Sequence, residues 1–172
     1  RSPRPEWALV VTPLITRRSL MGTAVGAIAG CATSRTHAAP QSMLFEVVRG
    51  DTLIGTHRLD FTHRDNELVV HVEIALEVEV AWIPVFRYEH TNHEVWRDGR
   101  LVHLESRTHD DGTDHVVRAH HDGQALVVEG DDGFVTVESD MLTTSYWHPE
   151  TPTRNRLLDT QKGRIKEVFH VP

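Results

Sequence analysis

The chain has 172 residues, of which 39% are hydrophobic and 25% are charged, a composition typical of one soluble globular domain. Its 18 Lys and Arg stand against 25 Asp and Glu, so the formal net charge is −7. Nucleic-acid binding depends on clustered positive charge, and this balance argues against it. The single cysteine excludes a disulfide framework and a Cys-based zinc finger.

Residues 1–31 have the pattern of an export signal. Arg17 and Arg18 directly precede an uncharged run of small and apolar residues, 19–30. This order matches a positively charged region followed by a short apolar region, and the paired arginines resemble a twin-arginine signal. The run is too short to span a bilayer, which takes about 20 apolar residues. We therefore expect an exported protein, located in the periplasm or at the cell envelope.

Two routes of processing are open at the end of this segment. The stretch Ile28-Ala29-Gly30-Cys31 resembles a lipobox, in which the cysteine is acylated and becomes the new amino terminus. Alternatively, cleavage after Ala38 or Ala39 releases a soluble protein. A lipid anchor is the one membrane contact that the sequence predicts. Without residues 1–30 the chain keeps 14 basic and 24 acidic residues, a net charge of −10, which argues against docking on anionic lipid.

Residues 32–42 show no periodicity and are predicted to form a tether. The first clear element follows at residues 67–80, where apolar residues occupy every second position. The apolar face consists of Leu68, Val70, Val72, Ile74, Leu76, Val78 and Val80. Seven consecutive matches indicate a strand, because helical spacing would place the intervening glutamates in the core. A strand of this length, about 46 Å, is expected to twist strongly or to curl around a core.

Asp-Gly steps mark turns between further short β-rich segments. This pair suits the left-handed dihedrals of tight hairpins, and it occurs at Asp98-Gly99, Asp111-Gly112, Asp122-Gly123 and Asp132-Gly133. A last strand over residues 164–171 is expected to close or edge the sheet. The sequence therefore predicts an all-β domain over residues 43–172, a single curved antiparallel meander of about eight or nine strands, barrel-like or half-barrel. A two-sheet sandwich is the second choice.

Several short motifs occur in a fixed order along this domain. They are Gly55-Thr56-His57-Arg58, Tyr88-x-His90, Glu94-x-Trp96, Asp98-Gly99-x-Leu101, Ser145-Tyr146-Trp147 and Leu158-Asp159-Thr160-Gln161-x-Gly163. In this order they resemble a bacterial exported family known as domain of unknown function 6134, over residues 44–168. The resemblance implies an exported β domain, and it implies no activity and no catalytic residues.

One face of the predicted strand at residues 85–97 is the best candidate binding site. It carries Tyr88, His90, Asn92, Glu94 and Trp96. A curved sheet brings Tyr146 and Trp147 over this face, and such a set of aromatic and polar groups suits an apolar or amphipathic ligand. The alternative is that the aromatic side chains are core residues and that His90 and Glu94 form a hydrogen-bonded pair.

The 13 histidines raise a second hypothesis, a histidine-rich periplasmic metal-binding protein. The densest group is Glu89-His90-Thr91-Asn92-His93-Glu94. On a strand, His90 and His93 point to opposite faces and reach one ion only at a bulge. No residue is therefore assigned as a metal ligand.

A hydrolase that uses His90 and Glu94 is the third hypothesis. The chain has no Gly-x-Ser-x-Gly motif, and Cys31 falls in the predicted leader. The Gly-x-Gly-x-x-Gly and Walker patterns that hold nucleotide phosphates are also absent, and no cofactor is predicted. The sequence thus favours a non-catalytic envelope domain that binds a hydrophobic small molecule, a lipid or a partner protein.

Overall fold

The computed structural model describes residues 42–168. The predicted export signal, with Arg17, Arg18 and Cys31, lies outside the described residues, as does the predicted tether up to residue 41. Within the described part, no helix is long and apolar enough to cross a membrane.

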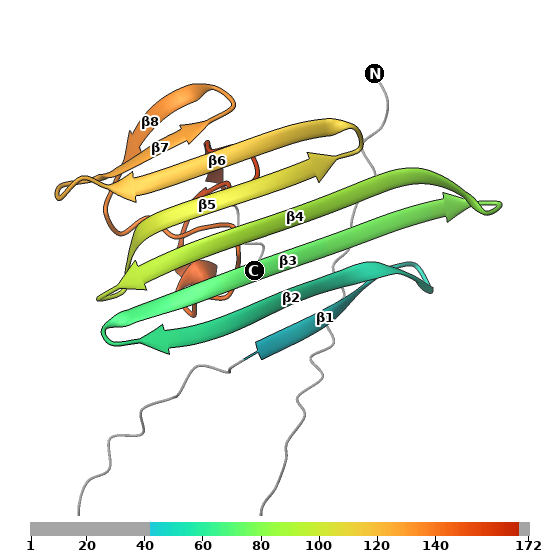
Figure 1. Ribbon diagram of the computed structural model, residues 1–172, viewed down its shortest axis with the longest axis horizontal. Helices are drawn as coiled ribbons and strands as arrows, with labels where there is room; N and C mark the ends of the chain where they lie inside the picture. The colour runs from blue at the N-terminus through green and yellow to red at the C-terminus, as the bar shows by residue number, and fades with distance from the viewer. Residues whose placement is uncertain (1–41, 169–172) are drawn as a thin grey trace, which may run out of the picture.

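The structure is an open antiparallel meander of eight strands, in which each strand pairs with the next one along the chain (Figure 1). The strands are β1 (Ser42–Arg49), β2 (Thr52–Arg64), β3 (Glu67–Val80), β4 (Ile83–Arg97), β5 (Arg100–Asp110), β6 (Thr113–His121), β7 (Leu126–Gly130) and β8 (Gly133–Val137). The sheet is curved but does not close, so β1 and β8 lie at its two edges. The predicted all-β meander is confirmed, as a half-barrel.

Alternating burial along β3 shows why this segment forms a strand. Val70 and Val72 are 0% and 1% exposed, whereas Glu73 and Glu77 are exposed on the opposite face. Burial of one face stabilises the strand even though glutamate disfavours strands intrinsically. Val80 is an exception to the prediction, because it is 61% exposed at the end of the strand.

The hairpin turns follow the predicted Asp-Gly chemistry in part. Asp98 and Asp111 adopt positive φ angles of 51° and 47° at the β4–β5 and β5–β6 turns. The β3–β4 turn was not predicted, because it has no glycine. There Ala81 and Trp82 take the left-handed conformation, with φ of 51° and 67°.

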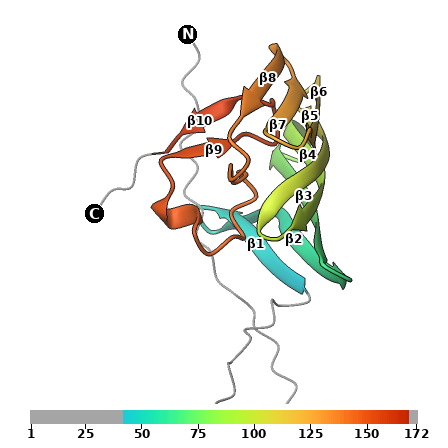
Figure 2. The ribbon, with the colours of Figure 1, turned by 90° about the vertical axis from the view of Figure 1, so that its left-hand side faces the viewer.

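Residues 138–168 fold back over the inner face of the curved sheet, and we call them the C-terminal cover (Figure 2). The cover contains a short 3-10 helix, η1 (Thr151–Thr153), and a hairpin of β9 (Arg156–Leu158) and β10 (Ile165–Glu167). The expectation that a last strand closes or edges the main sheet is wrong, because β10 pairs with β9 in a separate two-stranded sheet. The cover buries apolar side chains instead of supplying a ninth strand.

The hydrophobic core lies between the inner face of the sheet and the cover. From the sheet it takes residues such as Leu59, Val70 and Leu104, and from the cover Leu157 and Leu158, all at most 1% exposed. The inner surface of the sheet is therefore divided into a part under the cover and a part beyond it.

Candidate functional site

The inner face of β4 carries the predicted site residues in the order expected from the sequence. Tyr88, His90, Glu94 and Trp96 all lie on this face, together with Asn92, and their neighbours Glu89, Thr91 and His93 are exposed on the other face. In the sheet register, His90 lies between Ile74 of β3 and Thr108 of β5, and Glu94 lies between Val70 and Leu104. The strand alternation therefore predicted this face correctly.

Glu94 is completely buried and accepts four hydrogen bonds. Oε1 accepts from Asn92 Nδ2 at 2.8 Å and from Ser145 Oγ at 2.5 Å. Oε2 accepts from the indole nitrogens of Trp96 at 2.8 Å and Trp147 at 3.1 Å. All four donors are neutral, and together they match the acceptor capacity of a carboxylate. Two of them belong to the cover, so Glu94 connects the cover to the sheet.

The aromatic side chains around Glu94 pack edge to face. The ring centroids of Trp96 and Trp147 are 5.4 Å apart at an interplanar angle of 90°, and Trp147 also contacts Phe61 at 5.6 Å. His148 stacks on Trp96 at 5.9 Å. The prediction that Trp147 meets this face of β4 agrees with these contacts. Trp96, at 3% exposed, is a core residue in this arrangement.

His90 makes different contacts from those expected. Its Nδ1 is 2.7 Å from Thr108 Oγ1, and its Nε2 is 3.4 Å from Thr160 Oγ1 of the cover. The hydrogen-bonded pair between His90 and Glu94 is absent from the described structure, because the two side chains are four residues apart on one strand, about 13 Å. Burial lowers the pKa of His90 to about 4, so the ring is neutral near pH 7.

Beyond His90 the inner face becomes apolar and less covered. The next residues across the sheet are Ile74, His57 and Phe45, which are register neighbours on β3, β2 and β1. The rings of Phe45 and His57 are 5.7 Å apart. Phe45, His57 and Ile74 are half-buried, in contrast to the completely buried residues under the cover. Within the described chain, the buried Nε2 atom of His57 has no hydrogen-bond partner.

Two tyrosines, one on the sheet and one on the cover, lie near Asp159 of the cover. Tyr88 is half-buried on β4 and stacks on His90 at 6.4 Å, whereas Tyr146 is 54% exposed on the cover. Burial raises the pKa of both phenols, with Asp110 and Asp159 adding to the effect at Tyr88 and Asp159 at Tyr146, so both remain hydrogen-bond donors. Sequence reasoning did not select His57, Thr108 or Thr160, because their proximity to His90 depends on strand register and on the position of the cover.

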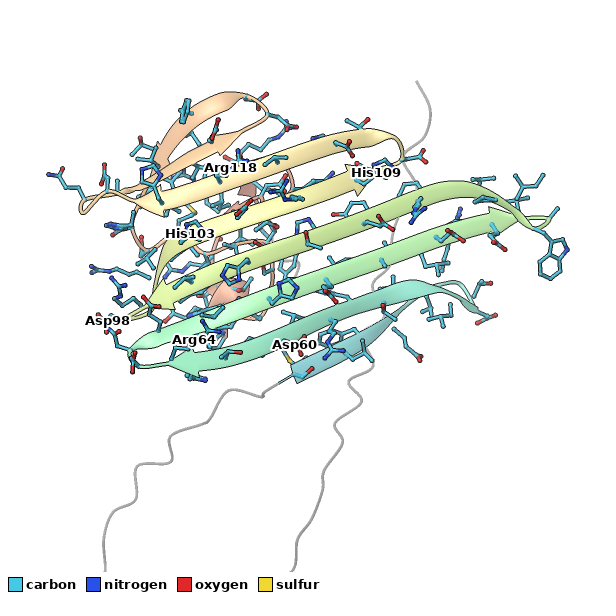
Figure 3. All side chains as sticks on the ribbon, viewed as in Figure 1. Asp60, Arg64, Asp98, His103, His109 and Arg118 are labelled. Atoms are coloured by element: carbon cyan, nitrogen blue, oxygen red, sulfur yellow. The ribbon has the colours of Figure 1, made fainter. Side chains whose placement is uncertain are left out.

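The outer face, on which Figure 3 labels His103, carries a separate group of histidines. His71 and His93 are register partners on β3 and β4, and Glu105 of β5 lies opposite His93. The ring of His103 is 6.4 Å from that of His93. His90 and His93 lie on opposite faces, as the sequence predicted. Among residues 42–168, no three His, Cys, Asp or Glu side chains are grouped closely enough to hold a metal ion.

Comparison with known protein families places most of the described domain in a family. Residues 45–170 match the family described as "Domain of unknown function (DUF6134)". No curated protein and no solved structure matches the chain.

Proposed function

The chain belongs to the DUF6134 family, and from that premise we propose that it is an exported, non-catalytic β domain of the cell envelope that binds a hydrophobic small molecule or a lipid. The ligand would lie against the part of the inner face that the cover leaves open. Tyr88 and His90 border this part on the sheet, and the proposed contact from the cover is Tyr146, which like Tyr88 lies near Asp159.

The unpartnered Nε2 atom of His57 is the observation that carries this proposal. It lies in a region lined by Phe45, Ile74 and Leu76, all half-buried. Binding sites for small molecules are mostly apolar, with a few fixed polar groups that orient the ligand. A buried polar atom without a partner is costly, and a ligand head group that displaces the side chains covering Nε2 of His57 and bonds to it removes that cost. This arrangement suits an amphipathic molecule.

The remaining predicted site residues lie on the part of the inner face under the cover, and their contacts support a structural role. Glu94, Trp96 and Trp147 have their polar atoms satisfied by one another and by the cover. We assign them to holding the cover in place, which sets one wall of the open region. The ligand contacts proposed for Tyr88, His90 and Tyr146 are separate from this role.

The envelope location rests on residues 1–31. Arg17 and Arg18 precede an uncharged run, and Cys31 stands where a lipobox requires its cysteine. Intact-mass measurement of the protein recovered from the producing cells tests both routes of processing. A new amino terminus at an acylated Cys31 supports the anchor, and cleavage after Ala38 or Ala39 supports release. An uncleaved chain in the cytosol contradicts export.

Binding is tested with a fluorescent fatty acid as the probe and with two variants of neighbouring residues. Leu76→Arg places a charge in the open region, whereas Ala75→Arg places the same charge on the exposed outer face of the same strand. We expect saturable binding to the parent chain and to Ala75→Arg, and a loss of about tenfold or more for Leu76→Arg. Equal binding by the two variants, with both folded by circular dichroism, contradicts the proposal.

Metal binding is the second candidate function, favoured by the outer-face histidines. Two opposed histidines on adjacent strands supply imidazole ligands suited to zinc or copper. Elemental analysis after dialysis against zinc or copper should show stoichiometric metal that His93→Ala removes and His90→Ala retains. A parent chain that takes up no metal excludes this function.

The hydrolase hypothesis has no supporting contact in the described structure. His90 bonds two threonines, and the carboxylate of Glu94 is occupied by four donors. Ser145 Oγ donates to Glu94 and is not activated by a histidine. An activity screen of the parent chain with Glu94→Gln as the control decides this hypothesis.

A further inference from the structure

The β3–β4 hairpin extends beyond the rest of the sheet (Figure 1). The ladder with β2 ends at Leu76, and the ladder with β5 begins at Tyr88. Residues 77–87 therefore continue as a two-stranded ribbon. An isolated two-stranded ribbon is only marginally stable in water, so its projection from the sheet indicates that its end makes a further contact.

The end of the ribbon is apolar and exposed. Trp82 is 92% exposed, Ile83 64%, Val80 61% and Val85 51%. No charged residue occurs between Glu79 and Arg87 in the sequence. Exposed apolar side chains are common singly, but a contiguous group at a projecting tip indicates an interaction surface.

The backbone of the tip is held in a conformation that favours other residues. Trp82 has a φ of 67° and Ala81 a φ of 51°, values that tight hairpins usually assign to Asn or Gly. A bulky residue in the left-handed region carries a strain of about 1–3 kcal/mol. The indole held in this turn is almost fully exposed.

Pro84 argues against a partner that adds a strand to the tip. It lies opposite Glu79, next to the register shift between Val78 and Glu79. Proline supplies no N–H group, and proline and bulges are features that prevent edge-to-edge pairing of strands. An apolar tip that does not pair with another strand is suited to a partner that it contacts through side chains alone, without backbone hydrogen bonds.

We propose that the tip of the β3–β4 hairpin, residues 80–85, inserts into the interfacial region of a lipid bilayer. Tryptophan is enriched at that depth, because its ring is apolar and its N–H group can reach water and head groups. The acidic domain, with Glu77 and Glu79 beside the tip, favours a neutral bilayer over an anionic one. This contact goes beyond ligand binding at the inner face.

The length of chain before β1 is compatible with this orientation, on the proposed premise of an acylated Cys31. Ten residues, 32–41, span about 33–36 Å when extended. Ser42 on β1 lies level with His71 on β3, because both are register neighbours of Asp60 on β2. From His71 to Trp82 the chain advances eleven residues along β3, which is about 36 Å. An anchor at Cys31 and the hairpin tip can therefore reach the same membrane plane.

The test measures the emission of Trp82 in vesicles of phosphatidylcholine, with and without brominated chains. The full chain carries Trp7→Phe and Cys31→Ser, so that two tryptophans remain besides Trp82: Trp96, which is buried in the core, and Trp147, which is partly buried against it. We expect a blue shift and strong quenching by the brominated lipid. Ile83→Glu should abolish both effects, whereas Phe134→Glu, which alters a 76% exposed aromatic residue on β8, should leave them unchanged.

Three outcomes overturn the proposal. The first is an unquenched Trp82 at saturating vesicle concentration, and the second is equal quenching in Ile83→Glu. The third is a blue shift without lipid that grows with protein concentration, which assigns the tip to a second copy of the chain. The variant Leu76→Arg distinguishes membrane insertion from ligand binding. We expect it to weaken binding of the fatty-acid probe and to leave the quenching of Trp82 by brominated lipid unchanged.

Discussion

Glu94 is a buried carboxylate that is stabilised without a cation. Burial of a charge is costly, and proteins usually compensate with an ion pair. Here two indole groups, an amide and a hydroxyl surround the carboxylate, and none of the ion pairs in residues 42–168 includes it. Because Ser145 and Trp147 come from the cover, the same hydrogen bonds fix the cover against β4.

Replacing Glu94 should therefore be among the most destabilising single changes in the domain. Glu94→Ala removes the carboxylate that accepts from four donors, three of them buried, and we expect a loss of about 3–5 kcal/mol in the free energy of unfolding. Urea denaturation followed by tryptophan fluorescence measures the loss. Glu73→Ala, on the exposed face of β3, should change stability by less than about 0.5 kcal/mol. Equal stability of the two variants would contradict the assigned role.

The pKa of His90 predicts how stability depends on pH. Burial lowers the pKa from its ordinary value of 6.5 to about 4 in the folded state. Below pH 6.5 the unfolded chain therefore binds a proton that the folded chain does not, and stability falls as the pH decreases toward 4. The loss from His90 is about 3 kcal/mol at most. Burial also lowers the pKa of His57, which acts in the same direction.

The contribution of His90 is isolated by a comparison of variants. Unfolding free energies of the parent and of His90→Asn are measured by urea denaturation between pH 7.5 and 4. We expect the parent to lose more stability than the variant over this interval. Parallel curves for the two proteins would show that His90 does not carry the effect.

Among the structural elements, the cover depends on a close backbone contact with β7. A Cβ atom at Gly130 would lie 2.4 Å from the carbonyl oxygen of Lys162 and 2.7 Å from the Cα atom of Gly163. The backbone hydrogen bond from Asp131 N to Lys162 O, 3.1 Å long, holds the same contact. Only glycine at this position allows the two chains to approach so closely.

Gly130→Ala should loosen the cover more than the sheet. Hydrogen exchange is expected to increase in residues 157–165, whereas β3 and β4 keep their protection. Gly50→Ala is the control for a glycine substitution without a close contact: a Cβ atom there meets nothing within 4 Å, and the φ of 61° adds only local strain at the β1–β2 turn. If β3 exchanges as fast as the cover in Gly130→Ala, the contact is required for the whole fold and not for the cover alone.

The sequence predicted those elements whose local signals agree with the final fold. The alternation in β3 and β4 identified both strands and their inner faces, because the period of two is a property of the strand itself. The Ala81-Trp82 turn was missed, because it lacks the usual turn residues. The β9–β10 hairpin was also missed, because three-residue strands have no measurable period.

The candidate site was predicted in part for the same reason. The face with Tyr88, His90 and Trp96 follows from strand alternation alone. The partners of Glu94 in the cover, and the position of His57 near His90, depend on register and on the path of distant residues. The predicted bond between His90 and Glu94 neglected the rise per residue along a strand.

At the scale of the whole molecule, the sheet and the cover form one folding unit. The inner face of the sheet exposes Leu59, Val70 and Leu104 when the cover is removed. A chain that ends after Val137 should therefore fail to form a stable, soluble sheet. We expect aggregation on expression and strong binding of an apolar dye in the remaining soluble fraction. A soluble truncated protein with cooperative unfolding would show that the sheet folds on its own.

The order of the strands has a consequence for synthesis. Each strand of the meander pairs with the one that precedes it, so the strands can pair one after another as the polypeptide leaves the ribosome. The cover, which shields the apolar inner face of the sheet, is translated after all eight strands. The nascent chain therefore passes through a stage in which all eight strands have been translated but their apolar face is still uncovered, and this stage is where a chaperone would be needed most.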